Sequence, residues 1–189
     1  MIDTLRTTPR AARSPLLAAA ALALSLPLVA SAHGPTRQKV SEGIDVDAPA
    51  AEVWALIGDF DAAHEWLPMV TETRAEGGNE PDATRTLVLE GGAEVNEVLR
   101  RYDGEGMSYS YRIPDATHDV AVLPVNNYSS TLSVADNGEG STVTWRGAFY
   151  RGYPNNDPPE ELNDEAAAAA VTGLYRAGLQ NIKSLVETP

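Results

Sequence analysis

The chain has 189 residues with no cysteine, and its 27 acidic residues outnumber its 14 lysines and arginines, which gives a formal net charge of −13 at pH 7. This charge argues against binding to nucleic acid or to anionic lipid, because both carry negative phosphates. The lack of cysteine excludes thiol catalysis, thiolate metal sites and disulfide bonds.

The N-terminal segment is typical of a secretory signal peptide. Arginines at positions 6, 10 and 13 precede an apolar run over residues 16–29, and Ala30-Ser31-Ala32 fits the small-residue rule for cleavage. The run is shorter than the about 20 residues that a bilayer-spanning helix needs, and an uncleaved anchor is the alternative. We therefore predict cleavage after Ala32 and export to the periplasm, with no membrane span in the mature protein.

With residues 1–32 assigned to the signal peptide, residues 33–189 have the size of one domain. The removed segment has three arginines and one aspartate, a net charge of +2, so the mature chain carries −15. A charge of this size favours solubility and attracts a basic partner.

The first elements of the mature chain are a strand and two short helices. Residues 37–47 alternate apolar and polar side chains, which predicts a strand. Pro49 suits the first turn of a helix whose apolar residues recur at helical spacing as far as Ile57. Gly58 ends this helix, and residues 60–66 are predicted to form the second one.

A series of strands follows. Glycine-rich turns, including Asp-Gly and Asn-Gly pairs, separate alternating segments in the pattern of antiparallel hairpins. We predict six strands, at residues 70–75, 83–89, 94–102, 107–113, 125–135 and 141–151.

The last element is one long helix over residues 164–186. Asn163 or Asp164 could begin it, and Asp157 followed by Pro158 offers an equally good start. We expect one apolar face, formed by Val171, Leu174, Gly178, Ile182 and Leu185, with Tyr175, Leu179 and Val186 beside it.

These elements predict an α+β fold. A curved antiparallel sheet of about seven strands wraps around the long C-terminal helix, with two short helices after the first strand. The helix must bury its apolar face on the concave side of the sheet, which leaves a space between them.

The sequence resembles the polyketide cyclase/dehydrase and lipid transport group, known as SRPBCC, which has the START and birch-pollen-allergen fold. The resemblance covers essentially the whole mature chain and implies a helix-grip fold. It rests on Val46–Trp54, Gly58-Asp59-Phe60, Trp66-Leu67-Pro68, Arg85-Thr86-Leu87, Glu97-Val98-Leu99 and Tyr109-Ser110-Tyr111-Arg112.

Within this group the chain is similar to the exported MxaD-like proteins of bacterial methanol-oxidation clusters. The motifs concerned are Pro124–Ser129, Val143-Thr144-Trp145, Phe149-Tyr150-Arg151 and Thr172–Leu179. The resemblance implies a periplasmic accessory protein that assists electron transfer between a quinoprotein methanol dehydrogenase and cytochrome c. Its partner would be one of these redox proteins, with a basic surface. The alternatives are a carrier of a small hydrophobic ligand, such as a lipid or quinone, and a polyketide cyclase/dehydratase-like enzyme.

Aromatic residues are the first candidates for a binding site. Residues 143, 145, 147 and 149 share one strand face, as do residues 107, 109, 111 and 113. If both faces are concave, their rings line an apolar pocket with phenolic groups, whereas the alternative is plain core packing. The candidate ligand-binding residues of this kind are Trp66, Tyr109, Tyr111, Tyr128, Trp145, Phe149 and Tyr175.

Glu97 is the most informative acid, because it alternates with Val95 and Leu99 on a face that favours burial. It is a candidate ligand-binding residue deep in the cup, and Arg85 or Arg112 could pair with it across strands. A structural ion pair, or a strand facing the other way, is the alternative.

Under the enzyme alternative, Glu97 or His118 would move protons, while Tyr109 or Tyr111 would orient a carbonyl. His118 lies between two prolines and two acids, where a solvated loop is the alternative interpretation. No metal-binding, nucleotide-binding or nucleophile motif is present, so we expect no metal and no cofactor.

Overall fold

The computed structural model describes residues 34–188, so the predicted signal peptide lies outside the described residues. The described elements are β1 (Gln38–Val46), α1 (Ala50–Ile57), the 3-10 helix η1 (Phe60–Ala62), α2 (Ala63–Trp66), β2 (Val70–Glu76), β3 (Thr84–Leu89), β4 (Glu94–Asp103), β5 (Ser108–Arg112), η2 (Asp115–Thr117), β6 (Val125–Asp136), β7 (Ser141–Arg151), η3 (Glu160–Leu162) and α3 (Asp164–Glu187).

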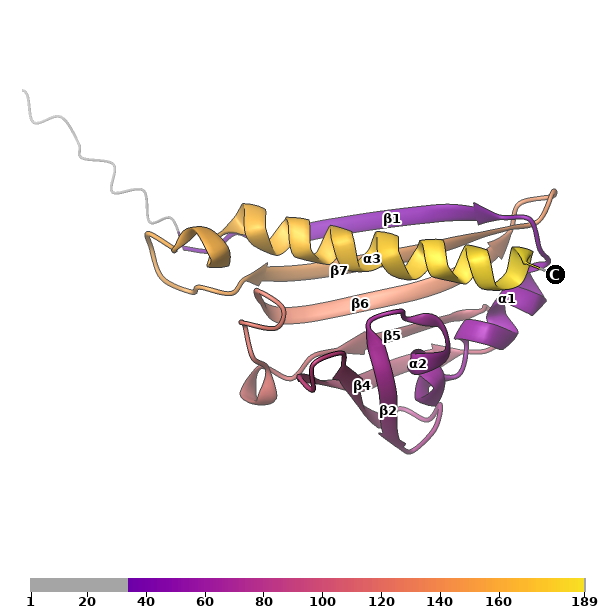
Figure 1. Cartoon of the computed structure of the whole chain (residues 1–189), viewed down its shortest axis with the longest axis horizontal. Helices are drawn as coiled ribbons and strands as arrows, with labels where there is room; N and C mark the ends of the chain where they lie inside the picture. The colour runs from indigo at the N-terminus through magenta and orange to yellow at the C-terminus, as the bar shows by residue number, and fades with distance from the viewer. Residues whose placement is uncertain (1–33, 189) are drawn as a thin grey trace, which may run out of the picture. The chain divides into compact units, whose positions relative to one another are not determined.

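The strands form one seven-stranded sheet in the order β1-β7-β6-β5-β4-β3-β2. Every neighbouring pair is antiparallel. The sheet curves, and the long helix α3 runs along β1 and β7 (Figure 1). The predicted helix-grip arrangement is therefore confirmed, with two short helices between the first and second strands.

Alternation along the strands separates an inner from an outer face of the sheet. In β7, Val143, Trp145, Gly147 and Phe149 are buried, whereas Arg146 between them is exposed. The inner face of each strand supplies apolar side chains to one contiguous core beneath α3. This burial is the main favourable contribution to folding in a chain without disulfides.

Helix α3 begins at the later of the two predicted starts. The side chain of Asn163 caps it by accepting a hydrogen bond from the Ala166 amide at 2.8 Å. Asp157 instead adopts a left-handed backbone conformation, with a φ of 55°, before η3. A residue in that conformation does not start a right-handed helix.

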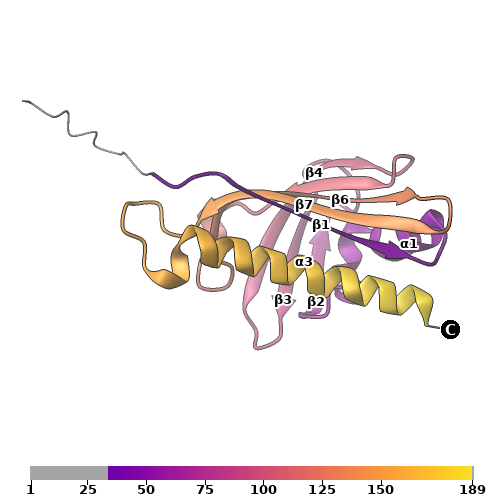
Figure 2. The same cartoon turned by 90° about the horizontal axis from the view of Figure 1, so that it is seen from above.

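The buried face of α3 differs in part from the expected one. It consists of Ala167, Val171, Tyr175, Gly178, Leu179 and Ile182. Leu185 is 46% exposed, so its assignment to this face was wrong. Viewed from above, α3 crosses one side of the sheet at β1 and β7, while β2 and β3 extend beyond it (Figure 2).

The short helices lie at one end of the sheet (Figure 1). Phe60 and Trp66 are buried there, and the Asn181 side-chain amide of α3 donates a 2.8 Å hydrogen bond to the Trp66 carbonyl. This bond ties the end of α2 to the long helix. None of the helices in the described part of the chain has the length and apolar character needed to cross a bilayer.

Candidate ligand cavity

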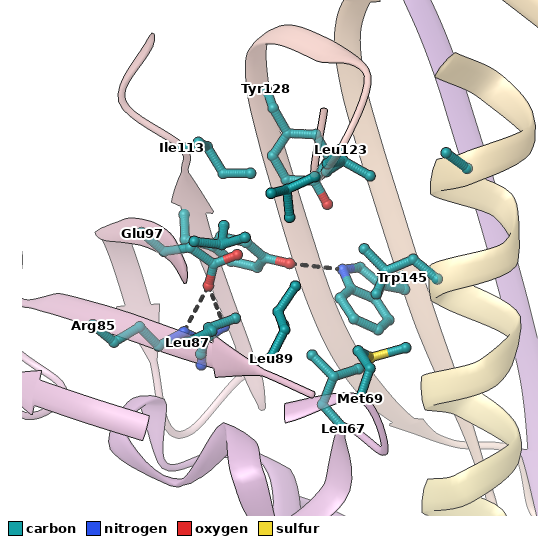
Figure 3. Close-up of a pocket in the computed structure, with 15 residues that line it drawn as sticks. Leu67, Met69, Arg85, Leu87, Leu89, Glu97, Ile113, Leu123, Tyr128 and Trp145 are labelled. Carbon is teal, nitrogen blue, oxygen red and sulfur yellow. Dashed lines mark hydrogen bonds and ion pairs between the residues drawn. The ribbon is translucent and has the colours of Figure 1, made fainter. Parts of the chain in front are cut away.

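A cavity of about 280 Å³ lies between the inner face of the sheet and α3 (Figure 3). It is close to the lower end of the range of ligand pockets, about 300–1,000 Å³. The lining comes from β3 to β7, from α3 and from two loops. The lining residues are Leu67, Met69, Arg85, Leu87, Leu89, Val95, Glu97, Tyr111, Ile113, Val122, Leu123, Tyr128, Trp145, Ala170 and Leu174.

The cavity has a buried floor and a partly exposed apolar mouth. Most floor residues come from the strands, where period-two alternation points them inward. The mouth consists of side chains that are only partly buried, namely Met69, Leu89, Val122, Leu123 and Leu174. A small apolar molecule would thus pass an apolar rim before it reached the floor.

A buried ion pair joins two strands at the floor. Arg85 of β3 and Glu97 of β4 are direct cross-strand partners, and both Nε and Nη2 of Arg85 lie 2.6 Å from Glu97 Oε2. Arg85 Nη1 also donates to the Phe60 carbonyl at 2.8 Å, and the guanidinium carbon lies 4.1 Å from the centroid of the Phe60 ring. Arg112, the other predicted partner, is exposed.

Burial raises the pKa of Glu97, and the adjacent Arg85 guanidinium opposes this shift by stabilising the carboxylate. A guanidinium does not give up its proton in a protein. Protonation of Glu97 would therefore leave the buried charge of Arg85 without its partner, which is costly. The pair acts as a unit with zero net charge on the floor of the cavity.

A chain of hydroxyl groups reaches the cavity lining at Tyr128 and continues through the buried Tyr175 and Ser130. The Ser130 hydroxyl donates to the Arg146 carbonyl at 2.8 Å, so it must accept from the Tyr175 hydroxyl at 2.9 Å. Tyr175 has then used its hydrogen, so it accepts from the Tyr128 hydroxyl at 2.7 Å. The order of donors is therefore fixed by the one carbonyl at the end of the chain.

The indole of Trp145 connects this chain to Tyr111. Its Nε1 nitrogen lies 2.9 Å from Ser130 Oγ and 3.1 Å from the Tyr111 hydroxyl oxygen, and its N–H donates to both. The dashed line from Trp145 in Figure 3 marks the second of these contacts. The Trp145 ring also stacks on Tyr175, with ring centroids 4.4 Å apart. Burial raises the pKa of Tyr175 to about 12, and it raises the pKa of both Tyr111 and Tyr128 well above the ordinary tyrosine value.

The predicted aromatic residues divide into two groups. Tyr111, Tyr128 and Trp145 line the cavity, as does the predicted acid Glu97. The other four do not line it and are buried in the surrounding core. These are Trp66, which meets Trp145 edge-on, Tyr109, Phe149, and Tyr175.

His118 does not reach the cavity. Its Nε2 lies 2.8 Å from the Leu123 carbonyl, a bond that closes the loop carrying the mouth residues Val122 and Leu123. Thus the structure does not bring Glu97 and His118 together as lining residues. The described residues also contain no cluster of three or more His, Asp or Glu placed to hold a metal ion.

Sequence reasoning missed most of the apolar lining. Leu87 and Leu89 alternate with Arg85 along β3, so the inward position of Glu97 and its partner could have identified them. Met69, Val122 and Leu123 lie outside regular elements and carry no periodic signal.

The comparisons with known proteins agree with this geometry. A family model described as "Polyketide cyclase / dehydrase and lipid transport" matches residues 37–187. No curated protein sequence matches the chain. Among solved structures, an uncharacterised protein from Bacillus thuringiensis has a TM-score of 0.62 at 29% identity, covering 79% of this chain and 98% of that one.

Two further structures show the same fold. The protein XoxI from Bacillus cereus has a TM-score of 0.62 at 28% identity, covering 79% of this chain and 94% of that one. Norcoclaurine synthase from Thalictrum flavum, solved with dopamine and hydroxybenzaldehyde, has a TM-score of 0.61 at 16% identity, covering 97% and 96%. The family match spans most of the sequence, and the chain therefore belongs to the polyketide cyclase/dehydrase and lipid transport family.

Proposed function

We propose that this is an exported binding protein that holds a small hydrophobic ligand in the cavity between its sheet and α3. The observation that carries the proposal is the cavity itself, with its buried floor and partly exposed apolar mouth. The volume of about 280 Å³ suits a compact molecule or one end of a longer one. It does not suit a whole two-chain lipid.

A proton-transfer reaction has less support from the geometry. The cavity offers one carboxylate, which is paired with Arg85, and His118 lies outside the lining. General acid–base catalysis needs a group that can take or give a proton within reach of the substrate. We therefore propose binding and carriage rather than a cyclase or dehydratase activity.

Native mass spectrometry of the protein purified from its producing cells tests the proposal. Val95→Phe would fill the cavity, because Val95 is buried in its lining. Val98→Phe is the matched control, since Val98 lies on the same strand but not in the lining. We expect a small-molecule adduct on the wild type and on Val98→Phe, and none on Val95→Phe. The same adduct on all three proteins, or on none, would contradict the proposal.

Export is the second part of the proposal, and it rests on the arginines and apolar run before Ala32. The expected result is a mature protein in the periplasmic fraction whose N-terminal residue is His33. A protein that is found in the cytoplasmic fraction and still begins at Met1 would contradict export.

A redox accessory role is the second candidate, and the acidic net charge favours it, at −13 for the whole chain and −15 after removal of residues 1–32. The charge is unevenly distributed, because five exposed cations share the outer sheet face, namely Lys39, Arg100, Arg101, Arg112 and Arg146. A basic methanol dehydrogenase or cytochrome c would therefore dock at the acidic start of α3.

Charge reversal tests this candidate. Glu160→Lys with Glu161→Lys should weaken salt-sensitive binding to a basic cytochrome c, because both residues are exposed beside α3. Arg112→Glu on the outer face should not weaken it. Equal loss in both variants, or no binding by the wild type, would contradict the role.

A further inference from the structure

We propose that the cavity selects an uncharged hydrophobic ligand that carries a hydroxyl group, and that Glu97 accepts the hydrogen bond from that hydroxyl. This inference rests on the proposed function, because it names the class of ligand for the same cavity. It follows from which polar atoms of the floor remain without a partner and from the charge balance around them.

The first unpartnered atom is Glu97 Oε1. Both contacting nitrogens of Arg85 lie against the other carboxylate oxygen, Oε2. Among residues 34–188, no group donates a hydrogen bond to Oε1, although Glu97 is 5% exposed and lines the cavity (Figure 3). A carboxylate oxygen that faces an enclosed cavity without a donor is unfavourable, and a ligand O–H or N–H would supply one.

The second unpartnered atom is the hydroxyl hydrogen of Tyr111. The Tyr111 oxygen accepts from Trp145 Nε1, but its own hydrogen has no acceptor within the described residues. Tyr128 differs, because its hydrogen is committed to Tyr175. The floor therefore presents one free acceptor and one free donor to the same cavity, and a hydroxyl group is the simplest ligand group that can both donate and accept.

The charge of the floor excludes ionised ligands. Arg85 and Glu97 already balance each other at 2.6 Å, and the Phe60 ring covers the guanidinium. A carboxylate ligand would add a second negative charge beside Glu97, and an ammonium ligand would add an unbalanced positive one. Either would leave a net charge in an apolar enclosure, which is strongly unfavourable.

Equilibrium dialysis of the wild-type protein at neutral pH against four matched probes tests this inference. The probes are naphthalene, 2-naphthol, 2-naphthoate and 2-naphthylmethylammonium, which share one apolar body. We expect 2-naphthol to bind about tenfold more tightly than naphthalene, as is typical of a hydrogen bond to a charged group. Both ions should bind more weakly than naphthalene.

The outcomes distinguish a failure of the proposed hydroxyl selectivity from a failure of the proposed binding function. If either ion binds as tightly as 2-naphthol, or if naphthalene and 2-naphthol bind equally, the inference is wrong while the cavity remains a binding site. If none of the four probes binds, the proposed function itself fails. The wild-type series alone decides between these results.

A double variant assigns any preference to Glu97. Arg85→Met with Glu97→Leu removes both charges together, which avoids leaving one charge unpaired. The ratio of the affinities for 2-naphthol and naphthalene should fall to near one. A ratio that keeps its wild-type value in the folded double variant would overturn the role of Glu97.

Discussion

Tyr175 of α3 occupies the space that a side chain on Gly147 of β7 would need. A Cβ built on Gly147 would collide with the Tyr175 hydroxyl. That hydroxyl links Ser130 to Tyr128, so the absence of a side chain at position 147 makes the hydroxyl chain possible.

Gly147→Ala should therefore destabilise the protein. Overpacking costs about 1–3 kcal/mol, and displacement of Tyr175 adds the loss of its hydrogen bonds. Gly43→Ala is the control, because a Cβ there would meet its nearest atom at an ordinary 3.5 Å. Urea unfolding measures both changes. Equal stability of the two variants would show that α3 can shift away from β7.

Removal of one partner of the Arg85–Glu97 pair should be strongly destabilising. Glu97→Ala or Arg85→Ala leaves a buried charge uncompensated, at a cost of about 3–5 kcal/mol. Arg85→Met with Glu97→Leu should be about as stable as the wild type or more so.

The exposed pair Arg74–Glu94, with a 2.9 Å contact, provides the control for this measurement. Glu94→Ala should change the free energy of unfolding by less than about 1 kcal/mol. Urea unfolding measures the free energy of unfolding of all four variants. If Glu97→Ala changes it by no more than Glu94→Ala does, then Arg85 is solvated by water or moves to another partner when Glu97 is removed.

The buried tyrosines predict a loss of stability in alkali. Burial raises the pKa of Tyr175 to about 12, and the pKa values of Tyr109, Tyr111 and Tyr128 are also raised. In the unfolded chain a tyrosine ionises near pH 10, so unfolding releases protons above that pH and stability falls as pH rises.

Thermal unfolding between pH 8 and 11 measures this slope, with tyrosinate absorbance followed in parallel. Tyr175→Phe should reduce the slope, because it removes one of the shifted groups. A stability that stays level above pH 10 would contradict the burial of these hydroxyls.

Glu187, at the end of α3, predicts that stability also falls in acid, so this contribution changes with pH in the opposite direction to that of the tyrosines. Glu187 accepts a 2.7 Å hydrogen bond from the Asp47 amide and lies 3.1 Å from Lys183, and the Asp47 bond, followed by Lys183, lowers its pKa. Its contribution is present above the ordinary glutamate value of about 4.3 and is lost as pH falls through the folded-state pKa.

Glu187→Gln should therefore be less stable than the wild type at pH 7, and the difference should disappear in acid. Glu80→Gln, in an exposed turn, is the control. Melting temperatures at pH 3 to 7 provide the measurement. A difference as large at pH 3 as at pH 7 would point to packing rather than charge.

Much of the fold could be predicted because its strands and helices have a clear hydrophobic periodicity and are bounded by turn residues. Alternation placed Glu97 on the same face as Leu99, and both are buried. The long helix was harder to place. Leu185 matches the apolar spacing but is exposed, whereas the neighbouring Val186 packs against the core.

The boundary between cavity and core could not be predicted. Tyr111 and Tyr109 share one face of β5 at a spacing of two, yet only Tyr111 lines the cavity. Periodicity assigns a face of the sheet, whereas the crossing position of α3 and the packing of the short helices decide which part of that face stays open. The mouth loop with Leu123 is instead placed by local hydrogen bonds, from His118 to the Leu123 carbonyl and from the Val122 and Leu123 amides to the Asp119 carbonyl.

The most direct test of the ligand cavity is equilibrium dialysis of 2-naphthol against wild type, Val95→Phe and Val98→Phe. The first substitution places a ring in the lining, and the second places the same ring outside it on the same strand. We predict binding to the wild type and Val98→Phe and its loss in a folded Val95→Phe. Equal binding by all three proteins, or by none, would contradict the proposal that the cavity between the sheet and α3 holds the ligand.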